Sequence, residues 1–78
     1  MPNGQTIKVI TDKLLEIKES NCFPEHILTI HQLKVFCPNL SIGEINEVLL
    51  GLELDGAITS LVKEGFEKDT TILKFRIN

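Results

Sequence analysis

Seventy-eight residues, 42% of them hydrophobic, with a formal net charge of −3 suit one small globular domain and argue against a disordered chain. No apolar run comes near the length of a membrane span, about 18 residues, and the first residues lack the apolar segment of a secretory signal. We therefore expect an intracellular protein, cytoplasmic or nuclear, with no membrane partner. Eleven acidic residues against eight basic ones exclude the overall basic excess usual in nucleic-acid binders, so any basic surface must be local.

The first predicted element is a helix over residues 5–20. Ile7, Ile10, Leu14 and Ile17 follow one another at steps of three, four and three residues, which places them on one face of a helix. We expect this face to be buried. The segment 21–25, which contains Pro24, ends the helix and forms a loop.

The next segment contains all the cysteines and histidines of the chain, Cys22, His26, His31 and Cys37, in the pattern C-x3-H-x4-H-x5-C. This spacing matches no established zinc motif, and Pro24 interrupts it. A chain without an export signal usually keeps its thiols reduced. The sequence therefore predicts free thiols, no metal site and no cofactor.

Two capping boxes predict a helix-turn-helix. Thr29 precedes Gln32 by three residues, and Ser41 precedes Glu44 by three, so each pair can satisfy the free N–H groups at the start of a helix. Leucine or isoleucine residues on both sides of each box can form a hydrophobic staple. The first of the two helices must stop before Pro38, because proline disfavours helical geometry in the residue that precedes it.

The helix that begins after Ser41 is predicted to bury one apolar face, formed by Ile42, Ile45, Val48, Leu49 and Leu52. Gly56 suits the left-handed residue that commonly ends a helix. The segments AITSLVKE and TTILKFRIN, joined by residues 65–69, are rich in β-branched residues and predict a β-hairpin.

This order of elements resembles the winged helix-turn-helix superfamily over residues 5–77. The carrying residues are Leu28-Thr29-Ile30, Leu33, Ser41 and the run Leu49-x-x-Leu52-x-x-x-Gly56-x-Ile58. The resemblance implies one α+β winged-helix domain over residues 1–78, with three helices and a C-terminal two-stranded wing. Locally, LLGLELDGAI resembles the C-terminal winged helix of the DprA/Smf DNA-processing family. The layout, with Ile17-Lys18, Pro24-Glu25 and Leu33-Lys34, also resembles the C-terminal winged helix of the replication protein A middle subunit, a protein-docking module.

In a DNA-reading helix-turn-helix the second helix of the motif enters the major groove. Residues 41–56 contain four acidic side chains and no Lys or Arg, so this helix would repel phosphates, and only Asn46 has the chemistry of a base reader. We therefore predict contact with a protein partner, or with a second copy in a homodimer, through Glu44, Glu47, Leu50 and Leu54. The alternative for the two leucines is packing beneath the hairpin or the first helix.

Four basic residues of the hairpin offer a second possibility, because together with Asn46 they could contact nucleic acid: Lys63, Lys68, Lys74 and Arg76. They could equally line the solvent face of the sheet. The sequence thus leaves two functions open: an adaptor or regulator within a transcription, replication or DNA-processing complex, or a dimeric regulator that binds DNA directly. No catalytic spacing and no phosphate loop are found, so we expect neither an enzyme nor a small-molecule substrate.

Overall fold

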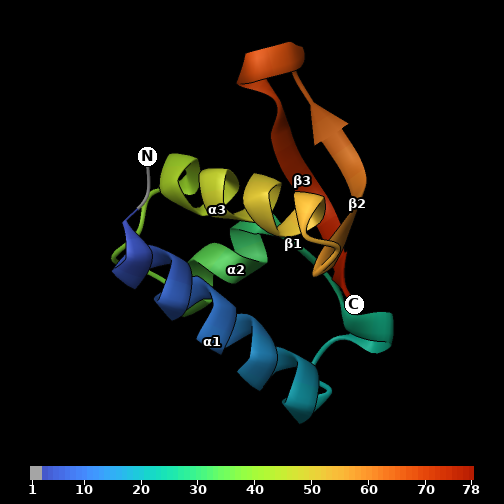
Figure 1. Ribbon diagram of the computed structural model, residues 1–78. Coiled ribbons are helices and arrows are strands. Elements are labelled where there is room, and N and C mark those ends of the chain that lie inside the picture. The colour runs from blue at the N-terminus through green and yellow to red at the C-terminus, as the bar shows by residue number, and fades with distance from the viewer. Residues whose placement is uncertain (1–2) are drawn as a thin grey trace.

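The computed structural model describes residues 3–78, except the side chain of Lys68. Figure 1 shows the α-helices gathered on one side and a β-hairpin that extends beyond them. The elements in chain order are α1 (Gly4–Ser20), the 3₁₀ turn η1 (Pro24–His26), β1 (Ile27–Thr29), α2 (Ile30–Phe36), α3 (Ile42–Leu54), β2 (Ile58–Glu64), the 3₁₀ turn η2 (Glu67–Asp69) and β3 (Thr71–Ile77). The α+β class predicted from the sequence is confirmed.

Both capping boxes are present, so the starts of α2 and α3 are set by local sequence. The Thr29 hydroxyl accepts a hydrogen bond from the Gln32 N–H at 3.1 Å, and the Gln32 side chain accepts one from the Thr29 N–H at 2.8 Å. Ser41 and Glu44 repeat this exchange at 3.1 and 3.0 Å. Each box satisfies N–H groups that a helix start leaves without an intrahelical partner.

The end of α3 turns directly into β2 through Gly56. This residue has a φ of 80°, in the left-handed region that glycine adopts at little cost. The Ala57 N–H donates to the Leu52 carbonyl at 2.9 Å, and the Gly56 N–H donates to the Glu53 carbonyl at 3.1 Å. This pair of bonds is a Schellman motif, and it explains how a run of buried leucines can pass straight into a strand.

The sheet has three antiparallel strands in the order β1-β3-β2. The prediction of a two-stranded wing was therefore incomplete, because β1 pairs with β3 through Ile27 with Arg76, Leu28 with Phe75 and Thr29 with Lys74. A strand of three residues is too short to display a period of two, and its partner lies more than forty positions away along the chain. Local sequence could show only that this segment is extended.

The pairing of β2 with β3 contains two register shifts, between Ser60 and Val62 and between Val62 and Lys63. Such shifts change which face of a strand a side chain occupies. As a result Ile72, Phe75 and Ile77 are all buried although the first two are three positions apart.

The hydrophobic core joins all three helices to the sheet, and its fully buried large side chains are Phe75, Ile10, Leu28, Ile30, Leu33, Ile45, Leu49 and Ile72. The buried line of α1 runs through Thr6, Ile10, Leu14 and Ile17, at steps of four, four and three. Ile7 was predicted to be buried, but it is 41% exposed. Thr6 takes its place because, at about 100° per residue, it lies about 40° from Ile10 around the helix, whereas Ile7 lies about 60° from Ile10 on the other side.

Candidate binding surfaces

The solvent-facing surface of α3 combines acidic side chains with one highly exposed leucine. Glu44, Glu47, Leu54 and Asp55 are exposed, and Leu54 is 88% exposed. Leu50, by contrast, is half-buried and packs against the core. The structure therefore separates the two leucines that the sequence grouped together, and Leu54 provides most of the apolar contact area on this surface.

Glu44 has a double role at the start of this surface. Its carboxylate caps α3 by accepting a hydrogen bond from the Ser41 N–H, and this bond lowers the pKa of Glu44 below its ordinary value of 4.5. A carboxylate at a helix N-terminus is also favoured by the helix dipole. The negative charge of Glu44 is therefore part of the helix cap and is retained at neutral pH.

Asn46, predicted as a base reader, is bound to the hairpin instead. Its side-chain N–H donates to the Thr70 carbonyl at 2.9 Å, and its side-chain oxygen accepts from the Ile72 N–H at 2.8 Å. Both groups of the amide are used within the protein, and the residue is half-buried. Asn46 therefore ties α3 to β3 and is not proposed here as a contact to a base.

Lys63 is held by a carboxylate of α3. Its ammonium lies 3.1 Å from Glu53, which also accepts a hydrogen bond from the Ser60 hydroxyl. The pKa of Glu53 lies below its ordinary value, mainly because of the hydrogen bond from Ser60 and to a smaller extent because of the contact with Lys63. Because the two charges offset each other, Lys63 adds little positive potential to the hairpin. The side chain of Lys68 lies outside the described residues.

Lys74 and Arg76 form the remaining basic site of the hairpin. They are exposed at alternate positions of the central strand β3, and neither makes an ion pair within the described part of the chain. Their cross-strand neighbours are Thr29 and Val62 beside Lys74, and Ile27 and Thr59 beside Arg76. No carboxylate stands among these neighbours, so this sheet face is locally positive.

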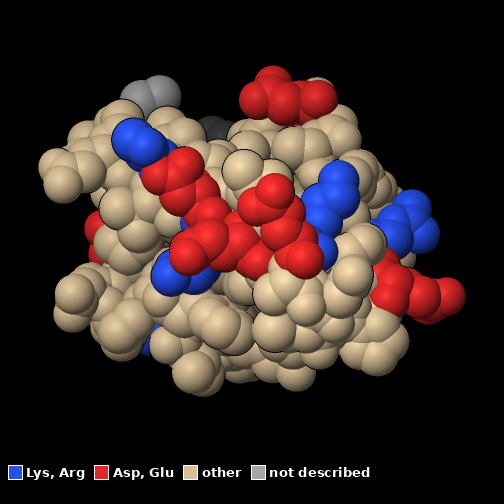
Figure 2. All heavy atoms as spheres, turned by 90° about the horizontal axis from the view of Figure 1, so that it is seen from below, with Lys and Arg blue, Asp and Glu red and all other residues tan. Residues whose placement is uncertain are grey.

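Two of the three basic residues of α1 are offset by carboxylates of the same helix, and the third, Lys18, donates to the main-chain oxygen of Asn78. Lys8 lies 2.7 Å from Asp12, and Lys13 lies 3.0 Å from Glu16. Figure 2 shows Asp and Glu side chains gathered near the centre of the face seen from below, with Lys and Arg beside them. The mixed charges would attract a nucleic-acid backbone weakly.

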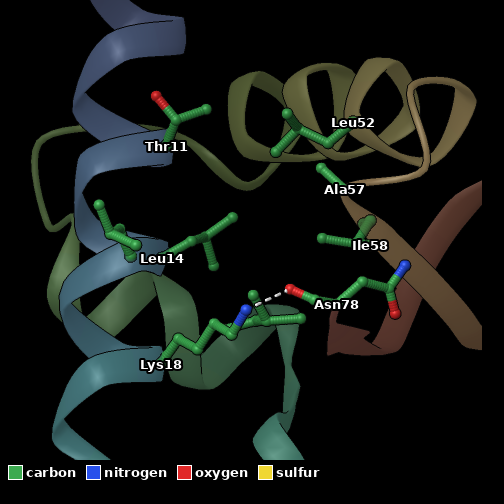
Figure 3. Close-up of a pocket in the computed structure, with 9 residues that line it drawn as sticks. Thr11, Leu14, Lys18, Leu52, Ala57, Ile58 and Asn78 are labelled. Atoms are coloured by element: carbon green, nitrogen blue, oxygen red, sulfur yellow. Dashed lines mark hydrogen bonds between the residues drawn. The ribbon is translucent and has the colours of Figure 1, made fainter.

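An open apolar groove of about 200 Å³ lies between α1 and the base of the hairpin. Its lining comes from four elements and the residues that flank them: Thr11, Leu14, Leu15, Lys18, Leu52, Ala57, Ile58, Ile77 and Asn78. Figure 3 shows Leu14, Leu52 and Ile58 around the opening, with Lys18 at one side. The Lys18 ammonium donates to the main-chain oxygen of Asn78 at 2.8 Å. Sequence reasoning missed this groove, because its walls are distant along the chain.

The cysteines and histidines remain dispersed. Cys22 is an exposed free thiol and Cys37 a buried one, whose pKa is raised by burial. Across residues 3–78 no group of three or more His, Cys, Asp or Glu side chains is placed to hold a metal ion. No helix within the same residues is long and apolar enough to cross a membrane.

No protein-family model matches this chain, and no curated protein or solved structure is significantly similar to it. Its function has to be inferred from the surfaces described above.

Proposed function

We propose that this chain is a non-enzymatic binding module of the winged-helix type, which acts as an adaptor or regulator in a nucleic-acid-handling complex and uses α3 to contact a protein. The observation that supports this proposal is the composition of the exposed α3 surface. Its exposed side carries Glu44 and Glu47 along the helix and Leu54 beside Asp55 at the end, and residues 41–56 contain no cation. The nucleic-acid setting rests on the resemblance of the sequence to winged helices.

The charge distribution favours a basic partner. Residues 41–69 carry seven acidic and two basic side chains, a net charge of −5, whereas the remaining residues carry four acidic and six basic ones, a net charge of +2. Carboxylates facing phosphates would oppose the counterion release that drives DNA binding. The same carboxylates would attract a segment rich in Lys or Arg, and an apolar side chain of that segment would cover Leu54.

Two titrations of the ¹⁵N-labelled protein test this proposal, with amide shifts as the measurement. The first probe is a helical peptide of Lys and Leu with one apolar face, and the second is a mixed-sequence DNA duplex. We expect the peptide to shift amides of residues 43–55 and the duplex to leave them unchanged at low salt. Leu54→Ala should weaken peptide binding, while the control Val35→Ala, at a position on α2 that is 76% exposed, should not. Duplex-induced shifts centred on α3 would refute the proposal.

A second candidate function is direct DNA binding through the sheet face. It is favoured by Lys74 and Arg76, two exposed cations at alternate positions of β3 with no carboxylate at their cross-strand positions. Each phosphate contact contributes about 0.9 to the slope of log K against log salt concentration. Lys74→Ala and Arg76→Ala should therefore each lower affinity and reduce the slope by about that amount. If neither changes the slope, the sheet face does not bind DNA.

A further inference from the structure

The turn of the β2–β3 hairpin presents Phe66 to solvent on a tightly built support. Gly65 has a φ of 95°, and a Cβ added there would collide with the main-chain oxygen of Asp69. The Asp69 N–H donates to the Phe66 carbonyl at 2.9 Å, and the Thr70 hydroxyl donates to the Glu67 carbonyl at 2.8 Å. Phe66 itself is 87% exposed. Because these bonds fix the backbone of the turn, ordering that backbone adds little to the entropy cost of binding through Phe66.

The surroundings of Phe66 are acidic. Among residues 64–69 three side chains are acidic, Glu64, Glu67 and Asp69, and one is basic. A phosphate backbone or an anionic membrane would be repelled by this composition. The chemistry that suits the turn is an apolar cavity with a cation at its rim.

The groove beside α1 has this chemistry. The groove is open to solvent, and its volume of about 200 Å³ leaves room for an aromatic ring, since an enclosed cavity of roughly 150 Å³ accepts benzene. Leu14, Leu15 and Leu52 contribute apolar walls, and Leu15 is 56% exposed. Lys18 stands at the side of the opening, where one N–H is used by the oxygen of Asn78. An ammonium group has three N–H donors, so two remain for a carboxylate.

The two features lie at opposite ends of the hairpin. Phe66 is in the turn, whereas Ile58 and Ile77, which line the groove, are at the base of β2 and β3. Strands of seven residues, at about 3.3 Å per residue, separate turn and base by more than about 20 Å. The turn of one molecule therefore cannot enter its own groove.

We infer that the hairpin turn of one copy inserts Phe66 into the α1 groove of a second copy, with the acidic residues of the turn beside Lys18. This contact joins two different surfaces, so each bound copy still offers a free turn and a free groove. Association of this type is head-to-tail and forms a ring or an open chain. It does not use the exposed surface of α3 and is independent of the proposed function.

Sedimentation equilibrium of the protein alone tests this inference, over concentrations from about 10 μM to about 1 mM, a range suited to a contact with one aromatic anchor. The average mass should rise with concentration above the 8.8 kDa monomer and pass that of a dimer. Phe66→Ala should weaken association by about 30-fold or more, as expected for a central aromatic anchor. Val35→Ala, the matched exposed control, should associate as the wild type does.

A mixing experiment separates this contact from any other self-association. Leu15→Glu places a carboxylate in the groove wall and should repel the acidic turn. At a concentration where the wild type associates, this variant and Phe66→Ala should therefore each be largely monomeric alone. Mixed in equal amounts, they retain one intact turn and one intact groove, and their mass should level off at a dimer. Ala57→Glu serves as a second groove variant if Leu15→Glu alters the circular dichroism spectrum. A monomeric wild type, a Phe66→Ala variant that associates as tightly as the wild type, or a monomeric mixture would each overturn the inference.

Discussion

Replacing Asn46 with alanine tests whether this side chain serves the fold or an external ligand. Its two hydrogen bonds, to Thr70 just before β3 and to Ile72 within it, each contribute about 0.5–1.5 kcal/mol net, so losing both should cost about 1–3 kcal/mol of unfolding free energy. Alanine is the better helix former and recovers up to about 0.7 kcal/mol. We therefore expect a net loss of about 1–2 kcal/mol, which is a considerable part of the roughly 4–12 kcal/mol typical of a domain of this size.

Urea denaturation followed by circular dichroism measures this loss, and hydrogen exchange of the Ile72 amide locates it. The Ile72 N–H donates to Asn46 in the wild type and should exchange faster in the variant. Gln5→Ala, at an exposed position of α1, is the control and should leave stability nearly unchanged. A loss below about 0.5 kcal/mol, within the range of ordinary surface substitutions, together with unchanged exchange at Ile72, would show that Asn46 does not hold the hairpin. The hypothesis that Asn46 contacts a DNA base would then be favoured again.

Three further predictions concern stability. Gly65→Ala should lower the free energy of unfolding by about 1–3 kcal/mol, because the added Cβ would collide with the backbone at Asp69. Gly51→Ala, whose Cβ would meet no other atom, should raise it by about 0.5–1 kcal/mol, and urea denaturation compares the two. Folding lowers the pKa of Glu44, so its carboxylate stabilises the fold above the unfolded-state pKa of about 4.5, and this effect is lost as the pH falls through the lower folded-state pKa. Glu44→Gln should therefore make the melting temperature depend less on pH on the acid side, and an unchanged dependence would contradict this. Leu49→Ala should cost about 2–5 kcal/mol and Leu54→Ala less than about 0.5 kcal/mol, and equal losses would refute the assignment of Leu54 to the surface.

The parts of the fold that the sequence predicted well depend on short-range signals. Both capping boxes join residues three positions apart, and Gly56 ends α3 through bonds that span no more than five positions. The identity of these few side chains is enough to place the helix ends. The starts of α2 and α3 and the end of α3 were therefore predictable.

The features that the sequence did not predict depend on long-range contacts. The pairing of Ile27 with Arg76 turns an extended segment into a third strand, and the bonds of Asn46 to Thr70 and Ile72 convert a possible base reader into a structural residue. The groove needs four elements at once, and the exposure of Phe66 depends on how the turn closes. None of these four features can be predicted from the residues of one helical turn or one strand alone.

The central position of β3 has a consequence for synthesis on the ribosome. Both edge strands pair only with β3, and β3 is the final element in chain order. While the earlier residues emerge, α1, α2 and α3 can form their own turns, but β1 and β2 have no strand to pair with. The pairing of β1 with β3 also closes a loop of more than forty residues, and such contacts are slow to form, whereas β2 and β3 are joined by a short turn. The nascent chain should therefore remain a loosely packed set of helices until residues 71–77 are available, with the hairpin forming before β1 joins it.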